Sequence, residues 1–273
     1  MDSVRRLLLS LLRITLMLTI GLAAYFKLFG NRFIFYPEKT IASVPQLNYE
    51  DVSFAAIDGA KLHGWFIPFA KSERVFVISH GNAGNIGDRA EMGEYINREF
   101  QASVLMYDYR GYGRSEGSPS EEGLYSDLRG ALSYVRSRGY APDAIYLIGQ
   151  SLGTAVTVEV AGHEPVAGII LEAPFPSVRA LARSYTFSIP LDYFLSARFD
   201  SASKIGFIKV PIVVVHGKAD PVIPFALGRQ LFEGATSRKQ FFAVEAPIHE
   251  GAMMALGVER TREIREFLFS ERR

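Results

Sequence analysis

The length and charge of this chain narrow what it can be. It has 273 residues, of which 48% are hydrophobic, so it is long enough to build one large α/β domain around a buried core. The 30 basic and 29 acidic residues leave a formal net charge of +1, which does not favour nucleic-acid binding. The chain has no cysteine, so disulfides, thiolate catalysis and cysteine-bound metals are excluded.

The first predicted element is the apolar stretch from Leu7 to Phe29, which just spans a bilayer as a helix. Arg5, Arg6 and Arg13 precede this stretch or lie early in it. The positive-inside rule therefore predicts a single-pass anchor at residues 1–30, with a cytoplasmic N-terminus and an extracytoplasmic (periplasmic or lumenal) domain. Two alternatives stay open: a cleaved signal peptide ending near Gly21-Leu22-Ala23, and an amphipathic helix lying in the interface.

Residues 31–47 mix aromatic residues, prolines and charges, which is typical of a linker at the lipid boundary. The globular domain is predicted to span residues 48–273. It opens with an antiparallel hairpin, in which strands Tyr49–Ile57 and Leu62–Ile67 are joined by an Asp58-Gly59 turn.

From Arg74 onward strands and helices alternate, which predicts a mostly parallel sheet with helices on both faces. The predicted strands are 74–79, 103–108, 144–148, 168–173, 211–217 and 240–245, and the predicted helices are 89–100, 119–138, 154–161, 224–234 and 259–269. The 119–138 helix has the clearest end signals. We expect Ser118 as its N-cap, Pro119 at the first helical position, Glu121 completing a capping box and Gly139 after the last turn.

The motif Gly149-Gln150-Ser151-Leu152-Gly153 stands where the 144–148 strand gives way to the next helix. In this context Gly-x-Ser-x-Gly indicates a nucleophile elbow, which holds its serine in a strained strand-to-helix turn. The two glycines are required because a Cβ at either position would collide with the neighbouring strand or helix. Ser151 is therefore the candidate nucleophile.

A serine hydroxyl needs a base to take its proton and a carboxylate to orient that base. On a hydrolase sheet the acid and then the histidine follow the serine, each after the carboxyl end of a strand. Asp220 follows the 211–217 strand and His249 follows the 240–245 strand. We expect Ser151, Asp220 and His249 to form a catalytic triad, with Glu172 as the reserve acid.

The loop His80-Gly81-Asn82-Ala83-Gly84 ends the 74–79 strand, where an oxyanion-hole loop belongs. We expect the backbone N–H groups of Asn82 and Leu152 to form that hole. Leu152 also begins the helix after the elbow, so its N–H lies at the positive end of the helix dipole.

The segment 174–208 is too long for a plain loop and predicts a small helical cap. It is rich in aromatic residues, which either line an acyl pocket above the nucleophile or pack on the sheet. The candidate substrate-binding residues are Phe175, Tyr185, Phe187, Tyr193 and Phe194.

The motifs HGNAGN, DYRGYGRSEGSP, GQSLG and HGKADPVIP, together with the final histidine loop, resemble the α/β-hydrolase superfamily. The N-terminal anchor followed by FIFYPEKT is similar to the membrane-anchored branch of that superfamily, and the similarity runs from about residue 25 to the end. It implies an α/β-hydrolase fold and a serine hydrolase with the triad on Ser151, Asp220 and His249. Members of this branch cleave carboxylic esters, acyl thioesters or, in aminopeptidase-like relatives, amides.

Two departures from that branch stand out. Ala246-Pro247-Ile248 precedes the histidine where relatives often carry Gly-Ala-Gly, which leaves the conformation of the histidine loop open. The cysteine-rich N-terminus of the eukaryotic depalmitoylating members is absent, which counts against that role.

The leading hypothesis is a serine hydrolase that cleaves ester or thioester bonds of acyl or lipid-like substrates, delivered from the membrane, through an acyl-enzyme. The alternatives are a serine exopeptidase, in which Glu172 and Asp192 would bind a free amine, and a catalytically silent hydrolase-fold scaffold. No cofactor or metal is expected, and the sequence does not predict an oligomeric state.

Overall fold

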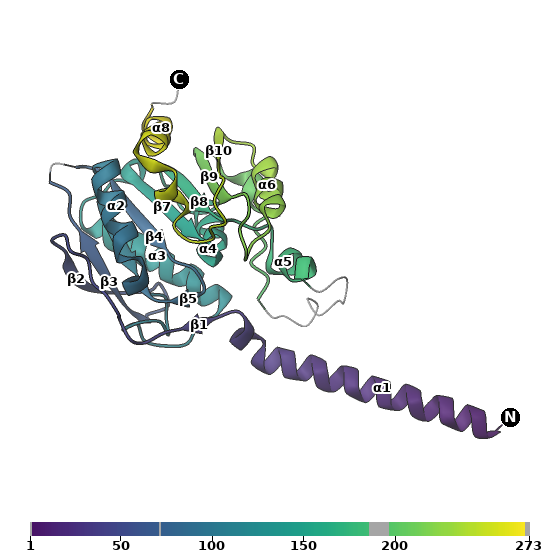
Figure 1. Ribbon diagram of the computed structural model, residues 1–273. Helices are drawn as coiled ribbons and strands as arrows, with labels where there is room; N and C mark the ends of the chain where they lie inside the picture. The colour runs from purple at the N-terminus through teal and green to yellow at the C-terminus, as the bar shows by residue number, and fades with distance from the viewer. Residues whose placement is uncertain (1, 71, 186–196, 271–273) are drawn as a thin grey trace.

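The computed structural model describes residues 2–70, 72–185 and 197–270 (Figure 1). Its centre is an eight-stranded sheet with the strand order β10-β9-β8-β7-β4-β6-β3-β2. The strands are β2 (Glu50–Ala55), β3 (Lys61–Ile67), β4 (Val75–Ser79), β6 (Ser103–Tyr107), β7 (Ile145–Gln150), β8 (Gly168–Glu172), β9 (Ile212–Gly217) and β10 (Lys239–Val244).

All neighbouring strands from β10 to β6 are parallel. Strand β3 pairs antiparallel with both β6 and β2, so the predicted N-terminal hairpin and the mostly parallel sheet are confirmed. A separate two-stranded sheet, which the sequence did not predict, pairs β1 (Tyr36–Pro37) with β5 (Ala83–Gly84).

Helices cover both faces of the large sheet. One face packs against α3 (Glu121–Ser137), α4 (Leu152–Ala161) and α6 (Phe225–Gly234), and the other against α2 (Ala90–Phe100) and α8 (Gly257–Phe269). Successive side chains of a strand point to opposite faces, so along β4 Val75 and Val77 join one core while Phe76 and Ile78 join the other. Because both faces are covered, the central strands are continuously apolar instead of alternating.

Helix α3 begins two residues later than its end signals predicted. Its N-cap is Ser120, whose Oγ accepts a hydrogen bond from the Gly123 N–H, so the assignment of Ser118 as N-cap and Pro119 as first helical residue was wrong. Glu121 closes no capping box there. Its carboxylate instead accepts the N–H groups of Arg198 and Phe199, at 2.6 and 2.7 Å, and so ties the segment after residue 196 to this helix.

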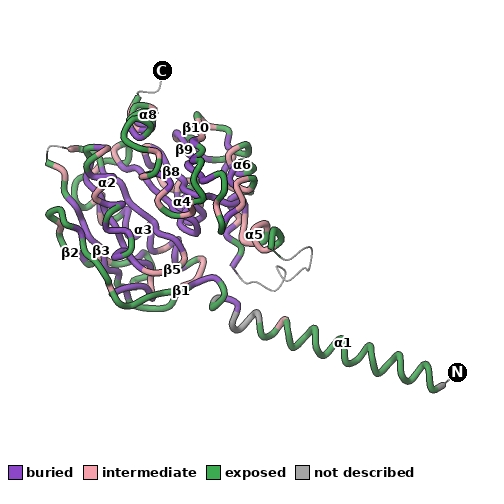
Figure 2. Tube along the Cα trace, in the orientation of Figure 1, coloured by how far each residue is buried: buried purple, intermediate pink, exposed green. Residues whose placement is uncertain are grey.

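Helix α1 (Asp2–Phe29) extends away from the domain, and its described side chains are almost all exposed (Figures 1 and 2). Its portion Ser3–Tyr25 is long and apolar enough to cross a membrane, a property that a signal sequence shares. A short 3₁₀ turn, η1 (Gly30–Phe33), connects it to β1.

The remaining helical elements are short. Within the predicted cap, α5 (Val178–Tyr185) follows β8, and η5 (Ile205–Phe207) precedes β9. The others are η2 (Ile86–Arg89), η3 (Pro142–Ala144) and α7 (Ala252–Ala255).

Candidate active site

Ser151 lies in the sharp turn between β7 and α4 with φ 49° and ψ −116°, a backbone conformation that is strained for a residue other than glycine. A Cβ on Gly149 would lie 2.4 Å from the carbonyl oxygen of Gly153, and a Cβ on Gly153 would lie 2.0 Å from that of Ser79. Both distances are well inside van der Waals contact. The expected reason for the two glycines is therefore confirmed, and the turn leaves no room for other residues.

The neighbouring strand β8 fixes the elbow from behind. The N–H of Ser151 donates to the carbonyl oxygen of Glu172. The buried carboxylate of Glu172 accepts from Gln150 Nε2 at 2.8 Å and from the Met253 N–H at 3.0 Å, and burial raises its pKa. The reserve acid thus braces β7 and α7, and the structure does not bring it to His249.

The structure brings together the three predicted triad side chains from the ends of three strands. His249 Nε2 lies 3.1 Å from Ser151 Oγ, and His249 Nδ1 lies 2.9 Å from Asp220 Oδ2. With the ring proton on Nδ1, His249 donates to the carboxylate and accepts the hydrogen bond of the serine hydroxyl. The first distance is short enough for proton transfer from the serine to the histidine, and the second is short enough for the carboxylate to orient the imidazole.

Four donors surround the Asp220 carboxylate. Oδ1 accepts the N–H groups of Val222 and Ile223, at 2.7 and 2.9 Å, and Oδ2 faces both His249 and His216. Burial alone would raise the pKa of this carboxyl, but these four donors outweigh it and hold the pKa well below its usual range. Asp220 therefore stays ionised beside the histidine.

His216 is a member of the site that the sequence analysis did not identify. Its Nε2 lies 3.0 Å from the carbonyl oxygen of Ile223 and 3.3 Å from Asp220 Oδ2. Its ring is buried against α6, where a Cβ on Gly228 would lie 2.0 Å from Nδ1. The signal that could have revealed it is the four-residue spacing between His216 and Asp220 in HGKAD.

Asn82 and Leu152 lie with Ser151 in the wall of one cavity. Leu152 is the first residue of α4, so its N–H has no acceptor inside the helix. The carbonyl oxygen of Asn82 accepts from the Tyr36 N–H and the Tyr112 hydroxyl, at 2.9 and 2.7 Å, and these bonds fix the loop after β4. Both residues predicted to form the oxyanion hole therefore line the same cavity as Ser151.

An ion pair between the buried Arg89 and the partly exposed Glu250 lies beside the loop after β4. Arg89 Nη2 donates to Glu250 Oε1 at 2.6 Å, and Glu250 follows the triad histidine in sequence. A Cβ on Gly81 would lie 3.2 Å from this carboxylate oxygen and 3.6 Å from the Cβ of Ser151. The pair therefore connects the histidine loop to the oxyanion loop. Sequence reasoning missed it because its partners are 161 residues apart.

His80 begins the same loop and is fully buried. The Nδ1 atom of His80 lies 2.7 Å from the carbonyl oxygen of Gly81. The carbonyl oxygen of His80 accepts a hydrogen bond from the Tyr109 hydroxyl. Burial, followed by the nearby charge of Arg89, lowers the pKa of His80 to about 4. The side chain is therefore neutral at neutral pH and serves to pack the loop.

The cavity beside Ser151 has a volume of about 250 Å³ and is mostly apolar. Its apolar lining comes from the end of η1 and the residue after it, from the loop after β8, from α5 and from the turn after Asp220. The lining residues are Phe33, Ile34, Phe175, Val178, Leu181, Ala182, Tyr185, Val222 and Ile223. Of the candidate substrate-binding residues, Phe175 and Tyr185 line this cavity. Phe187, Tyr193 and Phe194 lie outside the described residues, as does Asp192.

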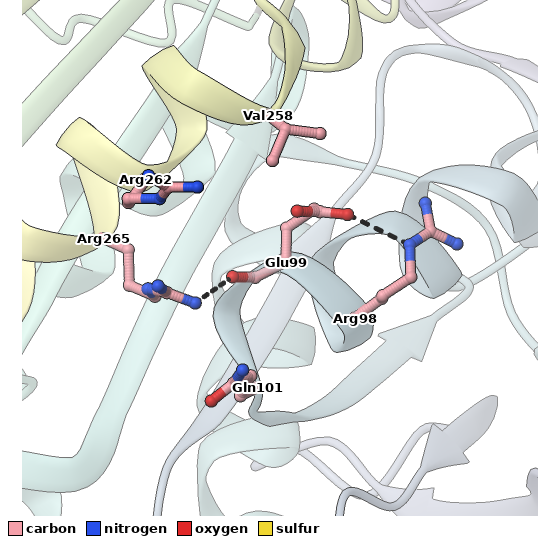
Figure 3. Close-up of a pocket in the computed structure, with 6 residues that line it drawn as sticks. All are labelled: Arg98, Glu99, Gln101, Val258, Arg262 and Arg265. Atoms are coloured by element: carbon pink, nitrogen blue, oxygen red, sulfur yellow. Dashed lines mark hydrogen bonds and ion pairs between the residues drawn. The ribbon is translucent and has the colours of Figure 1, made fainter.

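A second cavity, of about 210 Å³, lies between the end of α2 and α8 (Figure 3). It is polar, and three arginines in its wall surround Glu99. Arg98 donates to the carboxylate of Glu99 and Arg265 to its carbonyl oxygen. None of the triad residues lines it, so it offers no nucleophile. Among the described residues, no group of three or more histidines and carboxylates is placed to hold a metal ion.

Comparisons with known proteins agree with this fold. Residues 70–196 match the Hydrolase_4 family, described as serine aminopeptidase, S33. The chain is 34% identical over 223 residues to the uncharacterized protein YfhR of Salmonella typhi, which covers 76% of each chain. It is also 34% identical over 190 residues to the lysophosphatidylserine lipase ABHD12 of Danio rerio, over 63% of this chain and 50% of that protein.

Among solved structures, the esterase Pf2001 of Pyrococcus furiosus superposes with a TM-score of 0.70 at 18% identity. The match covers 85% of this chain and 98% of the esterase, and at this identity it establishes the fold alone. The family assignment rests on three observations: sequence similarity over three quarters of the chain, the eight-stranded sheet and the serine elbow. The chain belongs to the α/β-hydrolase superfamily and is a hydrolase.

Proposed function

We propose that this hydrolase cleaves carboxylic ester or thioester bonds of acyl or lipid-like substrates through an acyl-enzyme on Ser151. The observation that carries the proposal is the chain of contacts from Ser151 through His249 to Asp220, at the wall of an apolar cavity. A serine hydroxyl of ordinary reactivity becomes a nucleophile in such a setting.

In the proposed reaction, Ser151 Oγ attacks the carbonyl carbon while His249 Nε2 takes the hydroxyl proton. The negative charge that develops on the carbonyl oxygen is stabilised by the N–H groups of Asn82 and Leu152, and the imidazolium by Asp220. His249 then gives its proton to the leaving alkoxide or thiolate, and the acyl group stays on Ser151. Water, deprotonated by the same histidine, releases the carboxylic acid and restores the serine.

Because the lining of the cavity is mostly apolar, we expect it to bind the acyl chain of the substrate. Phe33, Phe175 and Tyr185 contribute aromatic surface. The other apolar side chains come from Ile34, from α5 and from the turn after Asp220. Each methylene buried there contributes about 0.8 kcal/mol, or roughly fourfold in affinity. Longer acyl chains should therefore react with higher kcat/KM until the cavity is full.

Chain-length profiling with p-nitrophenyl esters, compared with aminoacyl-anilides, tests this proposal. We expect kcat/KM to rise from the acetate to a medium-chain ester and the anilides to react far more slowly. Anilides that react faster than every ester would overturn the assignment in favour of an exopeptidase.

The exopeptidase remains the second candidate because the matching family is described as serine aminopeptidase. Such an enzyme needs a free carboxylate near the nucleophile to hold the substrate amine. Among the described carboxylates at the site, Glu172 is bound to Gln150 and Met253, and Glu250 is paired with Arg89. These existing partners favour the esterase. The third alternative, a silent scaffold, predicts no turnover of either substrate.

We also propose that residues 1–30 anchor the protein in a membrane, that residues 31–47 form a linker and that residues 48–273, with a cap at 174–208, form the catalytic domain on the extracytoplasmic side. The apolar portion Ser3–Tyr25, with Arg5, Arg6 and Arg13 in its N-terminal half, supports this topology. The cysteine-free chain allows a direct test at Ile57, which is exposed on the β2–β3 turn. A membrane-impermeant thiol reagent should label Ile57→Cys in intact cells, and labelling only after lysis would reverse the orientation.

A further inference from the structure

The cavity beside Ser151 begins where the chain leaves α1. The membrane-length portion of α1 ends at Tyr25, and Phe33, which lines the cavity, follows eight residues later. Through α1 and η1 the helical rise places Phe33 only about 14 Å along the chain from Tyr25. The two rings also lie close together, tilted at 58° with their centroids 6.3 Å apart. A bilayer that holds α1 must therefore lie close to the cavity.

Large hydrophobic side chains stay exposed around the mouth of this cavity. Four side chains each expose about half of their surface: Phe33, Tyr36, Tyr185 and Val222. Phe33, Tyr185 and Val222 line the cavity, and the Tyr36 hydroxyl donates to the carbonyl oxygen of Phe33 at 3.2 Å. The Tyr185 hydroxyl donates to the carbonyl oxygen of Val222, so the end of α5 and the turn after Asp220 meet at one edge of the mouth. We define these four residues as the rim.

Exposed hydrophobic residues scattered singly over a surface need no explanation, but a group around an apolar cavity marks an interaction site. Tyrosine and tryptophan are enriched where a protein meets the membrane interface, because one end of each side chain is apolar and the other is polar. The rim has this composition, and it lies next to the end of the one described helix that is long and apolar enough to span a bilayer.

We propose that the rim is a second membrane contact, and that the leaflet from which α1 emerges covers the mouth of the cavity. An acyl chain then passes sideways from the lipid into the cavity without crossing water, and its ester group stops beside Ser151. This inference rests on the proposed function for the identity of the substrate, and on α1 remaining in the bilayer. The partner that the rim contacts is the lipid surface itself.

The contact can be measured without any activity. In the cysteine-free chain, Tyr36→Cys places a thiol on the rim and Ile57→Cys places a matched exposed thiol on the β2–β3 turn. Each full-length variant is labelled with a small fluorophore and reconstituted in phosphatidylcholine vesicles that contain nitroxide-labelled lipid. We expect strong quenching at position 36 and little at position 57. Equal quenching at both positions, or none at position 36, would overturn the proposal.

The functional consequence is tested by moving the domain away from the bilayer. A 20-residue Gly/Ser spacer inserted between Phe29 and Gly30 adds a root-mean-square separation of roughly 25 Å. The control carries the same spacer before Asp2, where it lengthens the chain on the other side of α1. Both variants are assayed on a long-chain ester embedded in the vesicles and on soluble p-nitrophenyl butyrate.

We expect the Phe29/Gly30 spacer to lower the rate on the embedded ester by roughly tenfold, because the effective concentration of lipid at the mouth falls, while the rate on the soluble ester stays unchanged. The control should keep both rates. An unchanged rate on the embedded ester, or an equal loss of both rates, would contradict the proposal. If the parent protein hydrolyses neither ester, the proposed function fails, whereas the quenching result still decides the membrane contact.

Discussion

Gly153→Ala is the substitution whose consequence the structure defines most closely. The added Cβ would lie 2.0 Å from the carbonyl oxygen of Ser79 and 2.7 Å from that of His80. The first distance is about 1.4 Å short of ordinary contact. Both oxygens belong to the backbone at the end of β4, in the middle of the sheet, so they cannot rotate away as a side chain would.

Relief of this clash must therefore move α4 away from β4 by about 1 Å, and Ser151, which immediately precedes α4, moves with it. Overpacking of this kind costs about 3 kcal/mol of unfolding free energy, at the upper end of its usual range. For a domain of this size the melting temperature should fall by roughly 6 to 12 °C. A displacement of 1 Å between nucleophile and base lowers kcat/KM by about 10².

The assay combines thermal melting of the full chain in detergent with steady-state hydrolysis of p-nitrophenyl butyrate. Gly162→Ala is the matched control, because Gly162 caps the other end of α4 with φ −72° and its added Cβ would meet no atom closer than 3.4 Å. The control should stay within about 0.5 kcal/mol of the parent or gain stability. If Gly153→Ala melts with the parent and keeps its kcat/KM within threefold, the steric account of the elbow is wrong.

Three further predictions concern the groups around the triad. Asp220→Asn should lower kcat by about 10⁴ with little change in KM, and a loss below tenfold would contradict the proposed role of the carboxylate. Burial lowers the pKa of His80 to about 4, below its value in the unfolded chain, so the folded state is destabilised when this side chain becomes protonated. The free energy of unfolding should therefore be unaffected by His80 above about pH 6.5 and should decrease by about 3 kcal/mol as the pH falls towards 4. Urea unfolding at pH 7 and pH 4.5 should show this loss, His80→Gln should reduce it, and equal losses in parent and variant would refute the assignment. Arg89→Met and Glu250→Gln should each lower kcat by roughly tenfold. The double variant should lose no more activity than the worse single variant, because both substitutions break the same contact. Fully additive losses would show that the two residues act separately.

The part of the fold that depends on local pattern could be predicted from the sequence. The strands of the large sheet are buried on both faces, so they stand out as short apolar runs, and the Asp58-Gly59 turn marks the hairpin. The start of α3 could not be predicted in the same way. Ser118 and Ser120 offer the same capping chemistry, and the choice between them depends on Glu121, whose carboxylate is held by Arg198 and Phe199 far along the chain.

The candidate site shows the same division. The three triad positions follow from chain order, because each lies after a strand end and those ends meet at one edge of the sheet. The Arg89–Glu250 pair depends on packing between loops that are 161 residues apart, and for His216 the four-residue spacing to Asp220 is the one local signal. The two-residue pairing of β1 with β5 is too short for any periodic pattern to predict.

Reaction of the purified protein with a fluorophosphonate probe, followed by peptide mapping, tests the central claim most directly. The parent protein should carry one label on the peptide that contains Ser151, because in the proposed mechanism the His249 imidazole, 3.1 Å away, activates that hydroxyl. Ser133→Ala, which removes an exposed serine hydroxyl on α3, should be labelled as fully as the parent, and Ser151→Ala should not be labelled. Equal labelling of Ser151→Ala and the parent would contradict the assignment of Ser151 as the nucleophile.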